Sequence, residues 1–186
     1  MKPYVGSSLC AIAVDGSIDL PSFILAIACE RSPHWLMFAG PDQQAPCLAL
    51  FDEQTIARRL DNVAGDNGST RSARRDFGFF EPAPFYSTGR LQLPALARAS
   101  GWLGAEALVI GAGDRLEVWD PAIAAERGDG TVAALALLHR RLSAQHEDDV
   151  APVLPLHDNL FHLGARTRHP APGGRGRRVS TAPRAA

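Results

Sequence analysis

Gly16-Ser17-Ile18-Asp19-Leu20-Pro21 is matched later in the chain by Gly89-Arg90-Leu91-Gln92-Leu93-Pro94, and this match is the most informative feature of the sequence. Each begins with a glycine suited to a turn, continues through a short segment suited to a strand, and ends in Leu-Pro. In the second stretch the apolar residues alternate with Arg and Gln, which is typical of a half-buried antiparallel strand. The proline predicts a helix start at the end of the strand, because proline is tolerated at the first helical position.

The same order of elements follows both stretches. Trp35–Ala39 and Cys47–Asp52 come after the first, and Ala107–Gly111 and Arg115–Asp120 come after the second. In both cases a turn separates two apolar segments, and the later segment ends in an aromatic residue followed by aspartate. Four elements in matching order indicate an internal duplication.

Short apolar segments bounded by Gly, Pro or Asp predict strands, and apolar residues three and four apart predict helices. We expect strands at Cys10–Val14, Ile18–Leu20, Leu36–Ala39, Leu48–Phe51, Leu91–Leu93 and Leu116–Val118. Helices are expected at Ser22–Glu30, Glu53–Val63, Ala95–Ser100 and Thr131–His146. Three of them carry apolar stripes, the first of which we expect to face the core: Phe23, Ile24 and Ile27; Ile56, Leu60 and Val63; Leu135, Leu138 and Leu142.

The charge of the chain is divided unevenly along its length. Of 186 residues, 19 are basic and 20 acidic, so that the formal net charge is −1. Residues 1–164 hold 13 basic and all 20 acidic residues, a net charge of −7, whereas residues 165–186 hold six arginines and carry +6. A negative body makes a broad electrostatic surface for DNA improbable, so that contact there must be local. The Pro-, Gly- and Arg-rich composition after residue 164 predicts a disordered arm.

Several classes of protein are excluded. No apolar run approaches the roughly 20 residues that a membrane span needs, and the N-terminus has no apolar signal segment. The cysteines are odd in number and never spaced C-x-x-C, which argues against a disulfide framework and a zinc knuckle and fits a reducing cytosol: Cys10, Cys29 and Cys47.

No constellation of residues points to an enzyme. Gly111-Ala112-Gly113 lacks the third glycine of a nucleotide-binding loop and is better explained as a hairpin turn. His157-Asp158 with His162, and His146–Asp149, lack recognised ligand spacing and are better explained as solvated surface. No nucleophile stands beside a histidine partner. We therefore expect no catalysis, no metal, no cofactor and no small-molecule substrate.

Arginines supply the candidates for contact with a nucleic acid. Arg90 follows the turn-forming Gly89, where a side chain can project from a hairpin tip; Gly16 is the matching turn residue of the first copy. Arg71, Arg74 and Arg75 share one face if their segment is helical, which would form a phosphate-contacting patch. Two alternatives stay open: the patch can be a solvated face paired with Glu53 or Asp61, and Arg90 a strand-edge arginine that serves solubility.

From about Tyr4 to Ala144 the chain resembles the MraZ family of transcriptional regulators, built from two tandem SpoVT-AbrB swapped-hairpin modules. The resemblance is carried by Gly89–Pro94, the hairpin Ala107–Asp120, Gly16 with Leu20-Pro21, Cys47–Phe51, and Arg71, Arg74 and Gly78. It implies a cytoplasmic, nucleoid-associated protein that assembles into a ring. It also implies binding to short direct repeats upstream of the division and cell-wall gene cluster, usually to repress it.

The chain departs from the family's Asp-x-x-x-Arg turn signature, which occurs in both copies of the family repeat. The second copy keeps Arg90 but has Tyr86 at the position of the Asp. The first copy has Ala13 and Ser17 at the two positions. The losses leave open a second hypothesis, a ring-forming assembly or partner-binding protein without specific DNA binding.

The expected fold is mixed and mainly β (α+β), with two tandem AbrB-like swapped-hairpin β units, short helices, a helical linker and a C-terminal helix. The expected boundaries are 5–53 for repeat 1, 54–80 for the linker, 82–126 for repeat 2, 129–147 for the C-terminal helix, and 148–186 for a mostly disordered basic tail. The expected partners are DNA and further copies of the chain, with no membrane.

Overall fold

The computed structural model describes residues 2–65, 74, 77–99 and 101–149. Residues 1–150 form one compact unit, and the second unit, residues 151–186, lies outside the described residues. The predicted basic tail therefore lies outside them as well, apart from its first two residues, which belong to the last turn of a helix that runs to Asp149.

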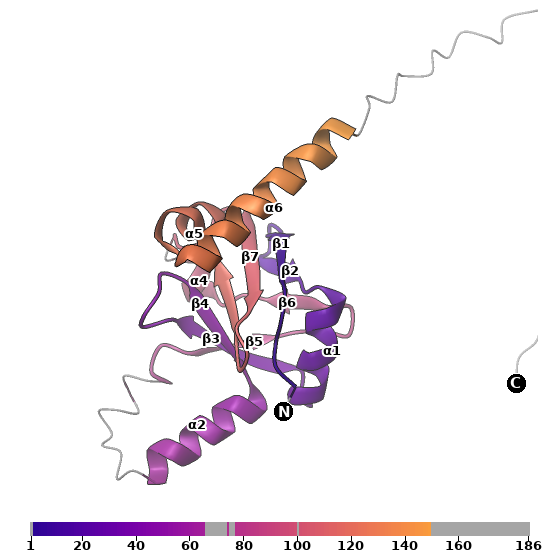
Figure 1. Cartoon of the computed structure of the whole chain (residues 1–186). Helices are drawn as coiled ribbons and strands as arrows, with labels where there is room; N and C mark the ends of the chain where they lie inside the picture. The colour runs from indigo at the N-terminus through magenta and orange to yellow at the C-terminus, as the bar shows by residue number, and fades with distance from the viewer. Residues whose placement is uncertain (1, 66–73, 75–76, 100, 150–186) are drawn as a thin grey trace, which may run out of the picture. The chain divides into compact units, whose positions relative to one another are not determined.

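The helices and strands come in an order that nearly repeats (Figure 1). The first half contains β1 (Ser7–Ala11), β2 (Ser17–Asp19), α1 (Ser22–Arg31), β3 (Leu36–Pro41), β4 (Leu48–Asp52) and α2 (Glu53–Gly65). The second half contains β5 (Glu81–Pro84), β6 (Arg90–Gln92), α4 (Ala95–Ala99), β7 (Glu106–Gly111), β8 (Leu116–Trp119) and α5 (Pro121–Arg127), followed by α6 (Gly130–Asp149). The predicted mixed, mainly β fold class is confirmed.

The large sheet interleaves strands from the two halves. Its order is β1-β7-β8-β4-β3-β5, and all its neighbours are antiparallel. Strand β1 of the first half pairs with β7 of the second, and β5 of the second half pairs with β3 of the first. The strand order is thus symmetric about the β8–β4 pair, and neither half completes its part of the sheet alone.

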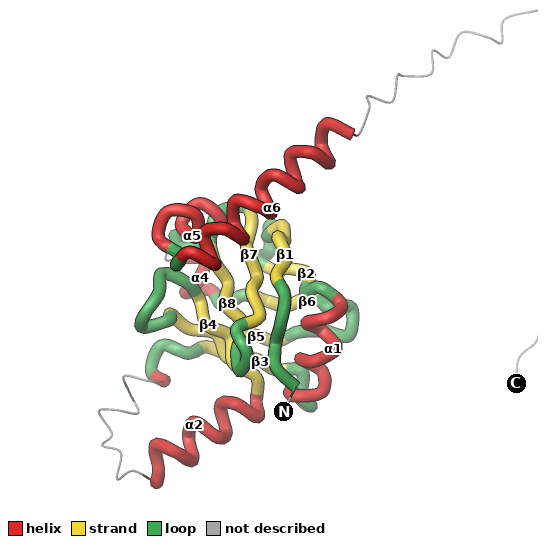
Figure 2. Tube along the Cα trace, viewed as in Figure 1, coloured by secondary structure: helices red, strands yellow, loops and turns green. Residues whose placement is uncertain are grey.

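A separate two-stranded ribbon, β2 with β6, joins the matching stretches from which the duplication was inferred (Figure 2). Ile18 lies opposite Leu91 in its antiparallel register. Equivalent hydrogen bonds close its two ends: Leu20 N donates to Gly89 O at 2.8 Å, and Leu93 N donates to Gly16 O at 3.2 Å. The two stretches therefore pair with each other across the molecule.

The alternating apolar residues of the ribbon point into the main core. Ile18 and Leu91 are 1 % and 0 % exposed, and they share one cluster with Leu50 and Leu116 of the sheet. Burying an aliphatic side chain of this size contributes about 1.5–3 kcal/mol. The inner face of the ribbon is therefore held firmly, which leaves its outer face to solvent.

The aspartate that ends each copy of the repeat starts a helix. Asp52 Oδ1 accepts from Thr55 N at 2.8 Å at the start of α2. Asp120 Oδ1 accepts from Ala122 N and Ile123 N, and Pro121 occupies the first helical position of α5. Both aspartates are thus N-caps, which is the physical reason for the repeated aromatic–Asp pattern. The sequence analysis did not predict α5.

Two strands differ from the prediction. The first strand is Ser7–Ala11 and not Cys10–Val14, since the chain turns at Ala13 and leaves Val14 fully exposed. Strand β5 was missed, because Pro82 and Pro84 argue against a strand. It forms at the edge of the sheet, the position at which a strand tolerates proline.

The helical stripes also need correction. Helix α1 buries Ile24, Ala28 and Arg31, whereas Phe23 is 43 % exposed. Helix α6 buries Val132 and Ala136, and its stripe of leucines is left largely in solvent, with Leu138 at 52 % and Leu142 at 48 % exposure. In α2, Leu60 is 49 % exposed and the side chain of Val63 lies outside the described residues. Spacing predicted the helices correctly, but only contact with the sheet determines which side is inner.

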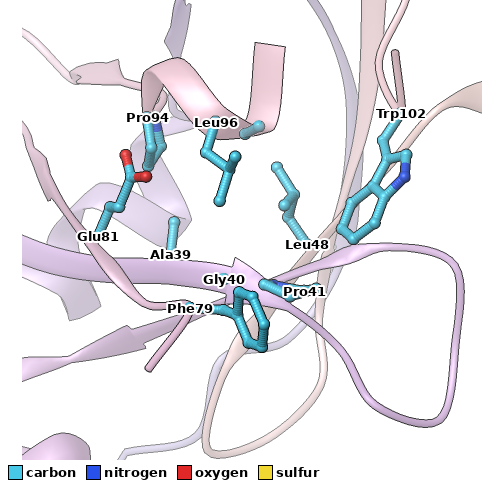
Figure 3. A pocket seen from close by; sticks show the side chains of 10 residues that line it. Ala39, Gly40, Pro41, Leu48, Phe79, Glu81, Pro94, Leu96 and Trp102 are labelled. Carbon is cyan, nitrogen blue, oxygen red and sulfur yellow. The ribbon is translucent and has the colours of Figure 1, made fainter. Parts of the chain in front are cut away.

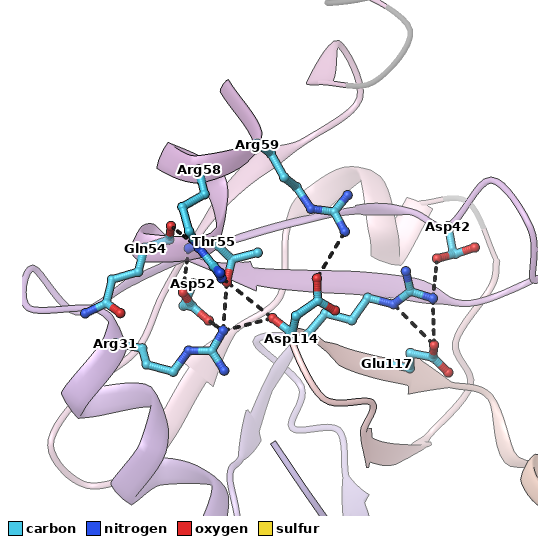
Figure 4. A network of polar contacts seen from close by, with 10 residues as sticks. Arg31, Asp42, Asp52, Gln54, Thr55, Arg58, Arg59, Asp114 and Glu117 are labelled. Atoms are coloured by element: carbon cyan, nitrogen blue, oxygen red, sulfur yellow. Dashed lines mark hydrogen bonds and ion pairs between the residues drawn. The ribbon is translucent and has the colours of Figure 1, made fainter. Parts of the chain in front are cut away.

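A buried polar cluster joins the end of α1 to the start of α2 (Figure 4). Arg31 and Asp52 form an ion pair at 2.7 Å, with side chains 2 % and 0 % exposed. The same guanidinium donates to Thr55 Oγ1 at 2.7 Å, to Asp114 O at 3.0 Å and to Lys2 O at 3.1 Å. One side chain thus ties the N-terminal segment, α2 and the β7–β8 turn together.

Candidate nucleic-acid interface

The outer face of the β2–β6 ribbon carries Arg90, one of the two described arginines that the sequence analysis proposed for contact with a nucleic acid. Alternation turns Ile18 and Leu91 inward, so Asp19, Arg90 and Gln92 lie on the other face. The Arg90 side chain is 49 % exposed. A cationic group thus lies on a narrow two-stranded ribbon.

Both proposed turn glycines lie at the ends of this ribbon and have positive φ, 81° at Gly16 and 93° at Gly89. The two turns have the same hydrogen bonds. Gly16 N donates to Ala13 O at 2.8 Å, and Gly89 N donates to Tyr86 O at 2.8 Å. Positive φ favours glycine because it has no Cβ, and this accounts for the glycine that leads each matching stretch.

Arg90 is held by the first copy of the repeat. Its Nε donates to Ser17 Oγ at 2.8 Å, and its terminal nitrogen Nη2 forms an ion pair with Asp15 Oδ2 at 2.6 Å. Ser17 Oγ in turn donates to Asp15 Oδ1 at 2.7 Å, which closes a ring of three side chains. We call Asp15, Ser17 and Arg90 the ribbon clamp.

The clamp lowers the pKa of Asp15. The largest cause is the hydrogen bond from the Ser17 hydroxyl, followed by the bond from Ser17 N, with the guanidinium of Arg90 adding to both. The carboxylate therefore stays charged to a lower pH than an aspartate without these partners. The sequence analysis treated Ser17 only as a lost arginine, whereas the structure makes it a partner of the remaining one.

Arg98 also lies at this turn and was missed by the sequence analysis. Its side chain covers Gly16 so closely that a Cβ built there would lie 2.1 Å from Arg98 Cδ. Among the described residues its guanidinium has no ion-pair or side-chain hydrogen-bond partner, in contrast to that of Arg90. No motif marks Arg98, since it comes from α4 and reaches the turn only in the folded chain.

The turn tips expose apolar and aromatic groups. Val14 is fully exposed in the first turn, and Tyr86 is 56 % exposed in the second. Tyr86 occupies the position of the family's Asp, and no described residue replaces that carboxylate within the second turn. The first turn, in contrast, has Asp15.

The basic patch can be described at one position alone. Arg74 is exposed, and its carbonyl accepts from Gly78 N at 2.8 Å. Arg71 and Arg75 lie outside the described residues, so that the expected shared face of the three arginines stays a prediction.

The sequence analysis also considered a glycine-rich turn and two histidine clusters as candidate sites. Gly111-Ala112-Gly113 forms the β7–β8 hairpin turn, as predicted. Among the described residues no group of three or more His, Cys, Asp and Glu side chains is placed to hold a metal, and no helix is long and apolar enough to cross a membrane. The His146–Asp149 side chains and His157, Asp158 and His162 lie outside the described residues.

A groove of about 360 Å³ lies over β3 and α4 (Figure 3). Its lining is almost wholly apolar, with Phe79, Leu96 and Trp102 at its rim and Glu81 as its one ionisable lining residue among those described. Such a surface suits contact with another apolar surface better than chemistry on a polar substrate.

Comparison with known proteins shows which proteins the chain is similar to. No protein-family model matches the chain. It is 24 % identical over 135 residues to a protein of Rhodospirillum rubrum named transcriptional regulator MraZ, covering 69 % of this chain and 86 % of that protein. It is 25 % identical over 120 residues to a protein of the same name from Alkaliphilus oremlandii, covering 62 % of this chain and 80 % of that protein. The similarity thus extends over most of both relatives.

Proposed function

Because the chain is related to the MraZ transcriptional regulators, we propose that it regulates transcription by binding DNA through the outer face of the β2–β6 ribbon. The observation that carries this proposal is the placement of Arg90 on a narrow, two-stranded ribbon beside two turn tips. The major groove of B-DNA, about 12 Å wide, admits a two-stranded β-ribbon. Arginine is the side chain best suited to guanine edges and to phosphate.

Each part of this face has a proposed role. Arg90 reads a base edge or holds a phosphate, and Arg98 at the neighbouring turn contacts the sugar-phosphate backbone of the DNA. Gly16 and Gly89 shape the turns that present them. Arg71, Arg74 and Arg75 hold phosphate from the linker, and this role rests on the sequence pattern alone.

Assembly makes binding by so few cations physically reasonable. Because residues 1–164 carry a net charge of −7, each subunit binds DNA only through the few arginines of its ribbon and linker, and this contact is weak. Several subunits on one DNA gain affinity together. We therefore propose a ring oligomer on direct repeats that represses the division and cell-wall gene cluster, in the cytoplasm and associated with the nucleoid. The half-exposed leucines of α6 and the apolar groove are the surfaces best suited to contacts between subunits.

A second candidate function is a ring-forming assembly or partner-binding protein that has lost specific DNA binding. The ribbon clamp favours it, because the cation that remains from the family signature already has an acidic partner. The exposed apolar surfaces suit both candidates.

The proposal is tested by fluorescence anisotropy with a labelled duplex of the region upstream of the division and cell-wall gene cluster. Arg90→Ala should weaken binding by about 1–3 kcal/mol if the contact is a bidentate one. Arg127→Ala is the matched control, because it removes the same charge from an exposed position on α5. Equal losses for both variants would show that the ribbon is not the interface. Absence of specific binding by the unaltered protein at low salt would favour the assembly function.

A further inference from the structure

The ribbon clamp occupies the edge of Arg90 that a nucleic acid would need. The Nε and Nη2 donors lie on the same side of a guanidinium and together bind two acceptors side by side. In this protein Ser17 Oγ takes the first donor and Asp15 Oδ2 takes the second. The edge that suits a phosphate or the O6/N7 edge of guanine is therefore filled from within the chain.

The partner of Arg90 is an anion with the geometry of the expected ligand. A carboxylate offers two oxygens to a guanidinium, as a phosphate does. Asp15 lies in the exposed first turn, with 52 % of its side chain in solvent, so that it can move aside without disturbing the core. Asp19, in contrast, lies opposite Arg90 in the β2–β6 register and has no ion pair with a described residue.

We propose that Asp15 is a built-in competitor of DNA for Arg90, so that binding exchanges the carboxylate for a phosphate or a base edge. This inference rests on the proposed function and adds to it the residue that sets the strength of the contact. Asp15 keeps the isolated module weak, and a single subunit therefore holds DNA poorly. Ser17 serves as the hinge of the exchange, since its hydroxyl bonds both members of the pair.

The test is the affinity of the Asp15→Asn protein for a random-sequence 30-base-pair duplex and for the upstream duplex at low salt. Release of Arg90 should tighten binding by about two- to five-fold, the range set by the loss of an exposed ion pair. Asp19→Asn is the matched control, because it removes the same charge from β2, the strand that follows the first turn, without releasing Arg90. Removal of a negative charge alone would tighten binding equally in both variants and would overturn the proposal.

A double-mutant cycle separates the clamp from a general charge effect. In the Arg90→Ala background, Asp15→Asn should have no effect on affinity for DNA, because the guanidinium for which Asp15 and DNA compete has been removed. An undiminished effect in that background would refute the exchange. A loss of affinity in Asp15→Asn itself would also refute it and would show that Asp15 positions Arg90 for binding.

Nuclear magnetic resonance gives a readout that needs no DNA. The Nε–H proton of Arg90, which donates to Ser17 Oγ, should exchange slowly with water in the unaltered protein and faster in Ser17→Ala. Equal exchange in both proteins would overturn the clamp whatever the binding data show. If the clamp is present but no variant binds either duplex, the proposed function fails and the competition fails with it. If the unaltered protein binds, Arg90→Ala weakens binding and Asp15→Asn does not tighten it, the competition alone fails.

Discussion

Replacement of Arg31 by alanine is expected to destabilise the fold more than most single substitutions would. The guanidinium is buried and forms an ion pair with Asp52, whose side chain is 0 % exposed. It also lies 4.4 Å from the centre of the Tyr4 ring and donates to two backbone carbonyls, Lys2 O and Asp114 O. Arg31→Ala would leave the carboxylate buried without its counter-charge.

The size of the effect follows from that stranded charge. Removing one partner of a buried ion pair costs about 3–5 kcal/mol, because the remaining charge is neither solvated nor paired. In Arg31→Ala the Asp52 carboxylate would retain Thr55 N as its hydrogen-bond donor, at 2.8 Å. For a chain of this length, about 2–4 °C of melting temperature is lost per kcal/mol. We therefore expect the transition to fall by about 6–20 °C.

Urea and thermal unfolding followed by circular dichroism measure the effect. Glu30→Gln is the control, since Glu30 lies on the same helix as Arg31. The change breaks an exposed ion pair with Lys2 and should cost about 1 kcal/mol or less. The double variant Arg31→Met with Asp52→Asn removes both charges, and the asparagine oxygen can still accept from Thr55 N. Its loss of unfolding free energy should be smaller than the sum of the losses of the single variants Arg31→Met and Asp52→Asn. Strict additivity, or an Arg31→Ala cost no larger than that of the control, would refute the reasoning.

Two further predictions concern the first turn. Because hydrogen bonds from Ser17 and the charge of Arg90 lower the pKa of Asp15, they stabilise the fold above the unfolded pKa of about 3.9, and this contribution is lost as the pH falls through the folded pKa. Ser17→Ala should therefore raise the Asp15 pKa toward its usual value in a carbon-detected titration, and an unchanged pKa would contradict the assigned cause. Gly16→Ala should lower stability by more than Gly113→Ala, measured by urea unfolding. Both positions have a φ of 81°, but only at Gly16 would a Cβ displace Arg98, whereas Gly113 faces open space. Equal losses would contradict the close approach of Arg98.

Of the residues at the candidate site, Arg90 could be predicted from the sequence, whereas its partner Asp15 and the neighbouring Arg98 could not. Arg90 could be found from the sequence because a repeat places it directly after a turn glycine, and turn chemistry is local. Asp15 could not be assigned to it, since the two residues are 75 positions apart and meet only when the ribbon forms. Arg98 carries no local signal, and its place over Gly16 depends on how α4 packs.

The sequence by itself indicated most of the segments that become strands and helices, because alternation, proline and glycine act over a few residues, although it did not indicate β5 or α5. It also indicated that the elements come twice. Only the tertiary structure decided that β1 pairs with β7 and β5 with β3, so that the halves interleave. Only the tertiary structure placed Arg31 in the interior and Leu138 in solvent, since the inner face of a helix is set by what it packs against. Pairing partners and burial are properties of distant residues brought together, and no local pattern encodes them.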